Sequence, residues 1–141
     1  MPERANIRLL DTLSALADTL VLELDADACA ISRAIGEVLI LVAERVPGGG
    51  TLQLGQGYLV SDFPQTAEVL AERVPRRLTL DDPDVDDSEA RVLRELGYRS
   101  LLMLPLELNS ATWGLVEVYR LDARPFDGDD VRRASSLTRL G

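Results

Sequence analysis

The sequence predicts an α+β domain built on an antiparallel sheet. Leucines recur every three or four residues near the start of the chain, which indicates a helix with one apolar stripe. Pairs of apolar segments separated by short turns occur twice, and short helices with capping signals lie between these pairs. This order of helices and strand pairs is typical of the α+β class.

The overall composition is that of one globular domain. The chain has 141 residues, 46% of them hydrophobic and 28% charged, so we expect a single folded domain over residues 1–141. A net charge of −9 argues against nucleic acid as a partner, because phosphate binding needs a basic surface. No apolar run is long enough for a membrane span, and no signal-peptide layout is visible. With a single cysteine, these features predict a cytoplasmic protein with no membrane partner.

The sequence contains no histidine, which removes much familiar catalytic machinery. Histidine-activated serine and cysteine nucleophiles are excluded, as are histidine-ligated zinc and haem. We therefore expect that the protein is not an enzyme.

The first part of the chain predicts a helix and then two strands. The helix is expected over residues 5–24, and its leucine stripe could face either the sheet or a second subunit. Strands follow at 28–34 and 37–46, with Gly36 at the turn between them. After a break rich in glycine, residues 51–61 fit either a strand or an irregular loop.

Two short helices with one strand between them come next. Residues 62–74 are expected to form a helix with Asp62 as N-cap, a proline in the first turn and a glutamine completing a capping box. A short strand is predicted at 76–80. The second helix is predicted at 87–97, where Asp86 can cap the start and a closing glycine supplies a left-handed stop.

The most apolar segment predicts a hairpin of two strands, at 99–108 and 112–121. Pro105 cannot donate to a ladder hydrogen bond, so we expect a local break there, with its nitrogen facing away from a partner strand or at a bulge. Gly114 indicates a bulge or the close approach of a neighbouring element.

The final segment predicts a helix that runs to the last residue. Asp127 can cap its start, two further aspartates suit its positive end, and Phe126 can pack onto Val131. Because no stop signal precedes Gly141, we expect the chain to be a fragment of a longer protein.

Three features that resemble motifs are explained better without chemistry. The aspartates at 82, 84 and 86 match the alternating ligands of a calcium loop, but the required glycine and the closing glutamate are absent. The glycines between residues 48 and 57 lack the lysine of a phosphate loop and the third glycine of a dinucleotide fingerprint. Cys29 lies between two alanines in a strand and is expected to be a small buried hydrophobe.

Glu117 is unusual because it is an acid among the apolar residues of the hairpin. Strand alternation places it on one face with Trp113, Leu115 and Tyr119. A carboxylate there could bind the amine or hydroxyl of a ligand, lie at a patch that faces water, or pair with an arginine. The last two interpretations are favoured, because buried carboxylates usually need a partner.

Residues 61–120 resemble the second half of a GAF domain. The matching features are Pro64 and Thr66 ahead of a helix, a short strand with an Asp-Pro loop, and a Leu-x-x-Leu-Gly segment. They continue with SLLMLPL, then Trp113 and the Gly-Leu pair that follows it, and RPFDGDD. The first half of the chain fits more loosely, through LDADACAISR.

The resemblance implies a GAF/PAS-like fold with a sheet of about six strands. The N- and C-terminal helices would lie on one face and pair with a second copy as a homodimer, while short helices on the other face would enclose a pocket. No cofactor is expected, since haem would need a histidine and Cys29 is poorly placed for a bilin. The chain also lacks the family's cyclic-nucleotide motif and the cysteine pair of its methionine sulfoxide reductases.

Two hypotheses for function follow from the resemblance. In the first, the chain is the regulatory sensor module of a bacterial-type signalling protein, where an unknown small molecule shifts the terminal helices and the shift is relayed to an output domain. In the second, a ligand-free GAF domain serves as a dimerisation and relay element, since only 4% of the residues are aromatic. The candidate residues for the pocket of the first hypothesis are Tyr58, Phe63, Thr66, Tyr98, Trp113 and Glu117.

Overall fold

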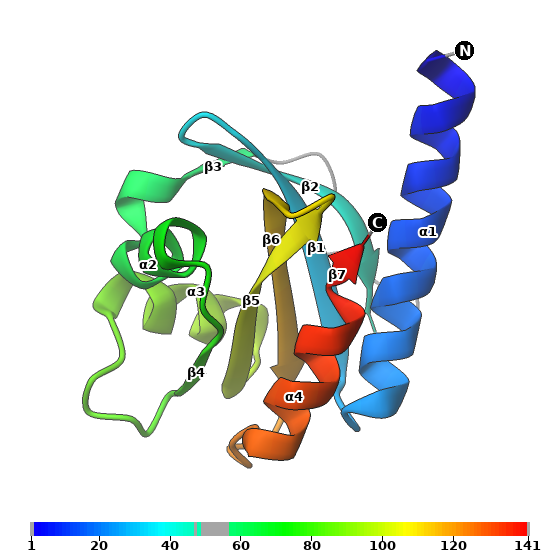
Figure 1. The fold of residues 1–141 in the computed structure, drawn as a ribbon. Helices are drawn as coiled ribbons and strands as arrows, with labels where there is room; N and C mark the ends of the chain where they lie inside the picture. The colour runs from blue at the N-terminus through cyan, green and yellow to red at the C-terminus, as the bar shows by residue number, and fades with distance from the viewer. Residues whose placement is uncertain (1, 47, 49–56, 141) are drawn as a thin grey trace.

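One sheet separates two layers of helices in the computed structural model, which describes residues 2–46, 48 and 57–140 (Figure 1). The strands are β1 (Ala28–Ile35), β2 (Val38–Arg45), β3 (Gly57–Leu59), β4 (Arg76–Thr79), β5 (Ser100–Leu108), β6 (Ala111–Arg120) and β7 (Arg139–Leu140). The helices are α1 (Pro2–Glu23), α2 (Pro64–Glu72), α3 (Asp87–Leu96) and α4 (Gly128–Leu137), with a 3₁₀ turn η2 at Val60–Asp62.

The sheet has the order β3-β2-β1-β6-β5-β4, and all of these neighbours are antiparallel. Among the described strands, β7 alone pairs in parallel, against the end of β5. Helices α1 and α4 cover one face, and α2 and α3 cover the other (Figure 1). The predicted α+β class and the expected distribution of helices between the two faces are therefore confirmed.

Each face of the sheet has its own apolar core, because strand alternation sends successive side chains to opposite sides. On the α1–α4 face the large buried side chains are Leu13, Leu16, Leu20, Leu24, Ile31, Leu102, Leu104, Leu106, Val116, Val118 and Phe126. On the α2–α3 face they are Leu39, Leu41, Val69, Leu78, Leu93, Tyr98, Leu101, Met103, Leu115 and Tyr119. The sheet is thus buried on both faces at β1, β5 and β6.

The leucine stripe of α1 packs on the sheet rather than into solvent. Leu13 and Leu20 are fully buried in the core of that face, whereas Leu10 and Leu22 on the same helix are exposed. The helix ends in a left-handed turn at Asp25, which has a φ of 49°. The two strands expected after it are confirmed as β1 and β2.

Helix α2 begins later than predicted. It starts at Pro64, and Phe63 occupies the N-cap without a side-chain bond, so the prediction of Asp62 as N-cap is wrong. Asp62 instead belongs to the 3₁₀ turn η2, which is continuous with β3. Gln65 makes no capping box; its side chain donates to the Asp84 carbonyl and accepts from the Asp86 amide, which ties α2 to the acidic loop. The undecided segment 51–61 is a strand and turn from residue 57 onward, and its first part lies outside the described residues.

The predicted hairpin is β5 and β6, joined by a two-residue turn at Asn109 and Ser110. Both turn residues have positive φ, 51° and 67°, as a tight hairpin turn of the primed type requires. Pairing stays regular at Pro105, so the break expected there is wrong. The register instead shifts between Leu106 and Glu107, where β6 carries one extra residue.

Gly114 permits a very close contact between β6 and β1. A Cβ at this position would lie 2.0 Å from the Ser32 carbonyl oxygen, so only glycine fits without moving a strand. The expectation of close approach at Gly114 is confirmed.

The C-terminal helix starts as predicted but ends earlier. Asp127 and Asp130 form a reciprocal capping box at the start of α4. The helix does not run to the last residue, because it ends at Leu137 and the chain continues into β7. The amide of Glu107 donates to the Thr138 carbonyl, which fixes this turn to β5.

Candidate functional site

A small pocket lies between the sheet and the α2–α3 layer. Its cavity is about 50 Å³, which is room for a few water molecules. Strands β1, β2, β3 and β6 form its floor and one side, and α2 and α3 close it. The lining residues are Ala30, Ser32, Leu39, Leu41, Tyr58, Phe63, Thr66, Glu89, Val92, Leu96, Leu115, Glu117 and Tyr119.

Two carboxyl groups face this pocket from opposite sides. Glu117 comes from the sheet and hydrogen-bonds the hydroxyl of Tyr119. Glu89 comes from the first turn of α3 and accepts a hydrogen bond from the hydroxyl of Thr66 on α2. Among the residues that the structure describes, no lysine or arginine lines the pocket. The pocket is therefore acidic, with apolar walls.

Burial and mutual repulsion alter the acidity of both groups. Burial raises the pKa of Glu117 from 4.5 to about 8, and the charge of Glu89 adds to the rise, while the hydrogen bond with Tyr119 opposes it. Burial also raises the pKa of Glu89, against the lowering effect of the Thr66 hydrogen bond. At neutral pH the Glu117 carboxyl therefore carries a proton in most molecules.

Four of the six candidate residues line the pocket: Tyr58, Phe63, Thr66 and Glu117. The rings of Tyr58 and Phe63 meet edge to face at 6.2 Å between centroids. Tyr98 does not line the cavity; it is buried nearby and stacks on Tyr119 at 5.0 Å. Ligand binding by any of these residues stays a prediction.

Trp113 lies on the opposite face of the sheet from Glu117, so the prediction of a shared face is wrong. It packs against the core under α1 and α4, with the guanidinium of Arg33 5.6 Å from its ring centroid. The cause is the register shift in β6: Gly114 pairs with Leu106 and Thr112 with Glu107, which leaves Trp113 as the extra residue. One extra residue reverses the alternation of faces.

Glu89 is a pocket residue that the sequence-based candidates omit. Asp86 does cap α3 through the Glu89 amide, as predicted, but the Glu89 side chain turns inward. A signal was present, because residues 89, 93 and 96 share one face of a helix and Leu93 and Leu96 are apolar. An acid in that stripe indicates a carboxyl group pointing at the sheet.

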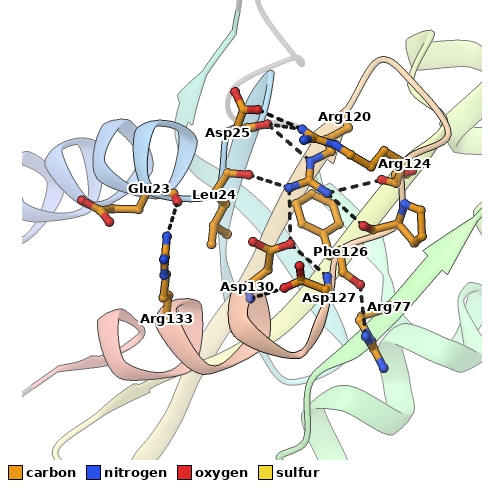
Figure 2. Close-up of polar contacts among 12 residues, drawn as sticks. Glu23, Leu24, Asp25, Arg77, Arg120, Arg124, Phe126, Asp127, Asp130 and Arg133 are labelled. Carbon is orange, nitrogen blue, oxygen red and sulfur yellow. Dashed lines mark hydrogen bonds and ion pairs between the residues drawn. The ribbon is translucent and has the colours of Figure 1, made fainter.

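A second polar cluster lies on the other face, around Arg120 (Figure 2). This guanidinium is buried and donates to the carbonyls of Leu24 at 2.6 Å and Asp25 at 3.3 Å, which end α1. It also donates to the Pro125 carbonyl at 3.1 Å and to the Asp130 carboxylate at 3.3 Å, at the start of α4. Arg120 therefore joins the end of α1 to the start of α4.

Two further arginines support this junction. Helix α1 has no basic residue in its own last turn, so its final carbonyls are capped from elsewhere in the chain. Arg133 on α4 donates to the Glu23 carbonyl, and Arg124 donates to the carbonyl and carboxylate of Asp25 (Figure 2). The ring of Phe126 lies under Arg120, 4.0 Å from its guanidinium carbon. We call this set the arginine junction.

Neither a metal centre nor a reactive thiol is formed by the described part of the chain. Its cysteine and acidic residues form no group of three suited to hold a metal ion. In the acidic loop 81–87, Asp82 accepts from the Asp84 amide and the Asp86 amide donates to Gln65. Cys29 is buried on the α1–α4 face, where burial raises the pKa of its thiol. Within the same residues, no helix has the length and apolar character to cross a bilayer.

The sequence belongs to a known family. The model of the GAF domain matches residues 8–140, so the chain is a member of the GAF domain family. No curated protein matches it.

Solved structures with the same fold include photoreceptor and sensor-kinase GAF domains. The blue-light absorbing form of the Thermosynechococcus elongatus PixJ GAF domain is 20% identical, with a TM-score of 0.75 over 92% of this chain and 80% of that one. The GAF domain of a two-component sensor histidine kinase from Bacillus halodurans is 21% identical, with a TM-score of 0.74 over 91% and 86%. A phycoerythrobilin-bound GAF domain from a cyanobacterial phytochrome is 19% identical, with a TM-score of 0.77 over 96% and 86%. These likenesses show that the chain has the GAF fold.

Proposed function

We propose that the chain is the regulatory sensor module of a bacterial-type signalling protein. In this proposal a small molecule binds the acidic pocket, changes how α1 and α4 pack, and thereby signals to an output domain without any catalysis. The observation that carries it is the position of β6, which supplies consecutive residues to both regions. Tyr119 lines the pocket, and Arg120 is the centre of the arginine junction.

Strand β6 directly connects the pocket with the arginine junction. A ligand that moves Glu117 or Tyr119 moves the backbone that carries Arg120, and the bonds from this guanidinium to the Leu24 and Asp25 carbonyls constrain the end of α1. For useful signalling, the ligand must favour one arrangement of the helices by about 1–3 kcal/mol. Loss of one charge-assisted hydrogen bond is of that size.

The ligand that we propose is smaller than a bilin. Two of the structural neighbours hold phycocyanobilin or phycoerythrobilin. Here the cavity is about 50 Å³, and the only cysteine, Cys29, is buried on the opposite face of the sheet. The described residues therefore do not fit a thiol-attached tetrapyrrole, and we propose no haem or bilin cofactor.

We also propose that α1 mediates a homodimer in the cytoplasm. Leu22 is 79% exposed and Leu10 is 42% exposed on this helix, although the same helix packs its other leucines inward. A second copy would cover these side chains. Light scattering of the wild-type chain should give a dimer and Leu22→Glu a monomer, while Leu59→Glu, at another exposed leucine, should leave the dimer intact; a wild-type monomer at high concentration would contradict the proposal.

The sensor proposal is tested by protein NMR with a library of small cations, neutral molecules and anions. A pocket ligand should shift the amides of Glu117 and Tyr119 and, through Arg120, those at the end of α1 and the start of α4. Arg120→Lys should keep the pocket shifts and reduce those at the helix ends, because lysine cannot span the same acceptors. Arg99→Lys, at an exposed ion pair, is the control and should change neither.

A second candidate function is a relay without a ligand. It is favoured by the internal bonds of the pocket, where Thr66 bonds Glu89 and Tyr119 bonds Glu117 without any ligand. If no library member shifts the pocket amides while the dimer persists, the sensor proposal fails and the relay function stands.

A further inference from the structure

We propose that the pocket recognises a small organic cation, an ammonium compound of a few non-hydrogen atoms; this inference rests on the proposed sensor function. The polar side chains that face the cavity are all carboxyl or hydroxyl groups. Glu89 and Glu117 supply two carboxyl groups, and the remaining polar side chains are the hydroxyls of Ser32, Thr66 and the two tyrosines at 58 and 119. Every one of these groups can accept a hydrogen bond from an ammonium, which has three donors and no acceptor.

The described protein supplies no cation of its own to this cavity. Arg76 is the basic residue that influences Glu89, and its guanidinium pairs with Glu68 on the surface. Arg33 lies over Trp113 and Arg120 lies in the arginine junction, both on the opposite face. A buried carboxyl pair without a cation is costly, so a positively charged ligand gains energy here that an anion or a neutral molecule cannot gain.

The hydroxyl partners leave the carboxyl groups able to bind a ligand. Thr66 donates to one oxygen of Glu89, and Tyr119 bonds Glu117, so each group is held in place while further lone pairs remain. These bonds orient two carboxyls toward one cavity from α3 and β6. A single ammonium between them would supply the positive charge that Arg120 supplies on the other face.

The cavity also limits the size and shape of the cation. Its 50 Å³ suits a short chain rather than a nucleotide or a tetrapyrrole. Leu39, Leu41 and Leu115 would contact an aliphatic part. The rings of Tyr58 and Phe63 are near the acids and offer faces that attract a cation.

The test compares three probes of equal length on the full chain by NMR: n-propylammonium, 1-propanol and propionate at constant ionic strength and pH 7.5. The expected result is saturable shifts of the Glu89 and Glu117 amides with propylammonium, at least ten times tighter than with the other two probes. Equal binding of propanol or propionate overturns the cation inference but leaves the sensor function in place. Failure of all three probes also overturns the inference, and the wider library then decides on the sensor function separately.

Charge-neutral variants locate the effect. Glu117→Gln should weaken propylammonium binding at least tenfold and leave the weak propanol signal unchanged, because glutamine keeps the shape but cannot release a proton to form the carboxylate that pairs with the ammonium. Glu72→Gln makes the same charge change at an exposed position of α2 and should bind as the wild type does. If Glu117→Gln fails to fold, Glu89→Gln serves in its place; unchanged affinity in the folded variant would overturn the inference.

Discussion

The two faces of the sheet surround an ionisable side chain in opposite ways, only three residues apart on β6. Arg120 has five protein acceptors, namely four backbone carbonyls and the Asp130 carboxylate, and a ring beneath it. Glu117 has one tyrosine hydroxyl and a second acid nearby. The comparison teaches that the number of partners, rather than burial alone, separates a charge that holds the fold together from one that is available to a ligand.

The largest expected effect on stability comes from replacing Arg120, whose guanidinium is bonded to several protein groups on the α1–α4 face. Arg120→Met should lower the free energy of unfolding by about 3–5 kcal/mol, because Asp130 and the end of α1 lose a buried cation. Urea unfolding measures the change. Arg99→Met removes an exposed ion pair and should cost less than about 1 kcal/mol. Equal costs for the two variants would contradict the distinction between the faces.

The next largest effect is a pH dependence of stability that comes from Glu117, the side chain with fewer partners. The raised pKa of Glu117 means that the folded protein holds a proton from about pH 4.5 to about pH 8 that the unfolded chain has released. Its contribution to stability is therefore full below pH 4.5 and is lost as the pH rises through 8. Glu117→Gln should match the wild type near pH 5 and exceed it by about 4 kcal/mol at pH 9.

This pH effect is measured by denaturant unfolding of both proteins between pH 5 and pH 9. Glu72→Gln, at an exposed position, should follow the wild-type curve throughout. A parallel pair of curves for Glu117→Gln and wild type would show that the Glu117 carboxyl ionises in an ordinary way, and the contrast with Arg120 would then disappear.

The smallest expected effect on stability comes from removing the N-cap residue of a helix on either face. Asp127→Ala removes a capping box whose partner, Asp130, also binds Arg120, and it should cost about 1–2 kcal/mol. Asp86→Ala removes a single, longer cap bond of 3.4 Å on α3 and should cost about 0.5–1 kcal/mol. Thermal unfolding of the two variants checks the order, and a larger loss for Asp86→Ala would reverse it.

The sequence predicted most elements because each carries local signals. The stripe of α1, the caps at Asp86 and Asp127 and the β5–β6 hairpin depend on residues close together in the chain. Phe63 displaced Asp62 as the cap of α2 because the preceding residues continue as a 3₁₀ turn. Tertiary packing decides whether α2 begins after Asp62 or after Phe63, and local sequence patterns do not report on that packing.

The site was predicted only in part because its geometry depends on distant residues. Trp113 was assigned to the wrong face because one extra residue in β6 reverses the alternation. The role of Arg120 depends on carbonyls of α1 that lie 95 and 96 residues away in sequence. The spacing of nearby residues does not predict such long-range pairs. The inward orientation of Glu89, in contrast, could have been inferred from the apolar residues on the same face of its helix.

Pro105 has a consequence for self-association of the chain. The amide of Glu107 points toward β7, so alternation points the nitrogen of Pro105 to the same edge, in the gap between β4 and β7. That gap would otherwise present a free donor to a strand from another molecule. Without an N–H there, the most apolar strand of the protein offers a poor template for aggregation, even though its side chains would favour it.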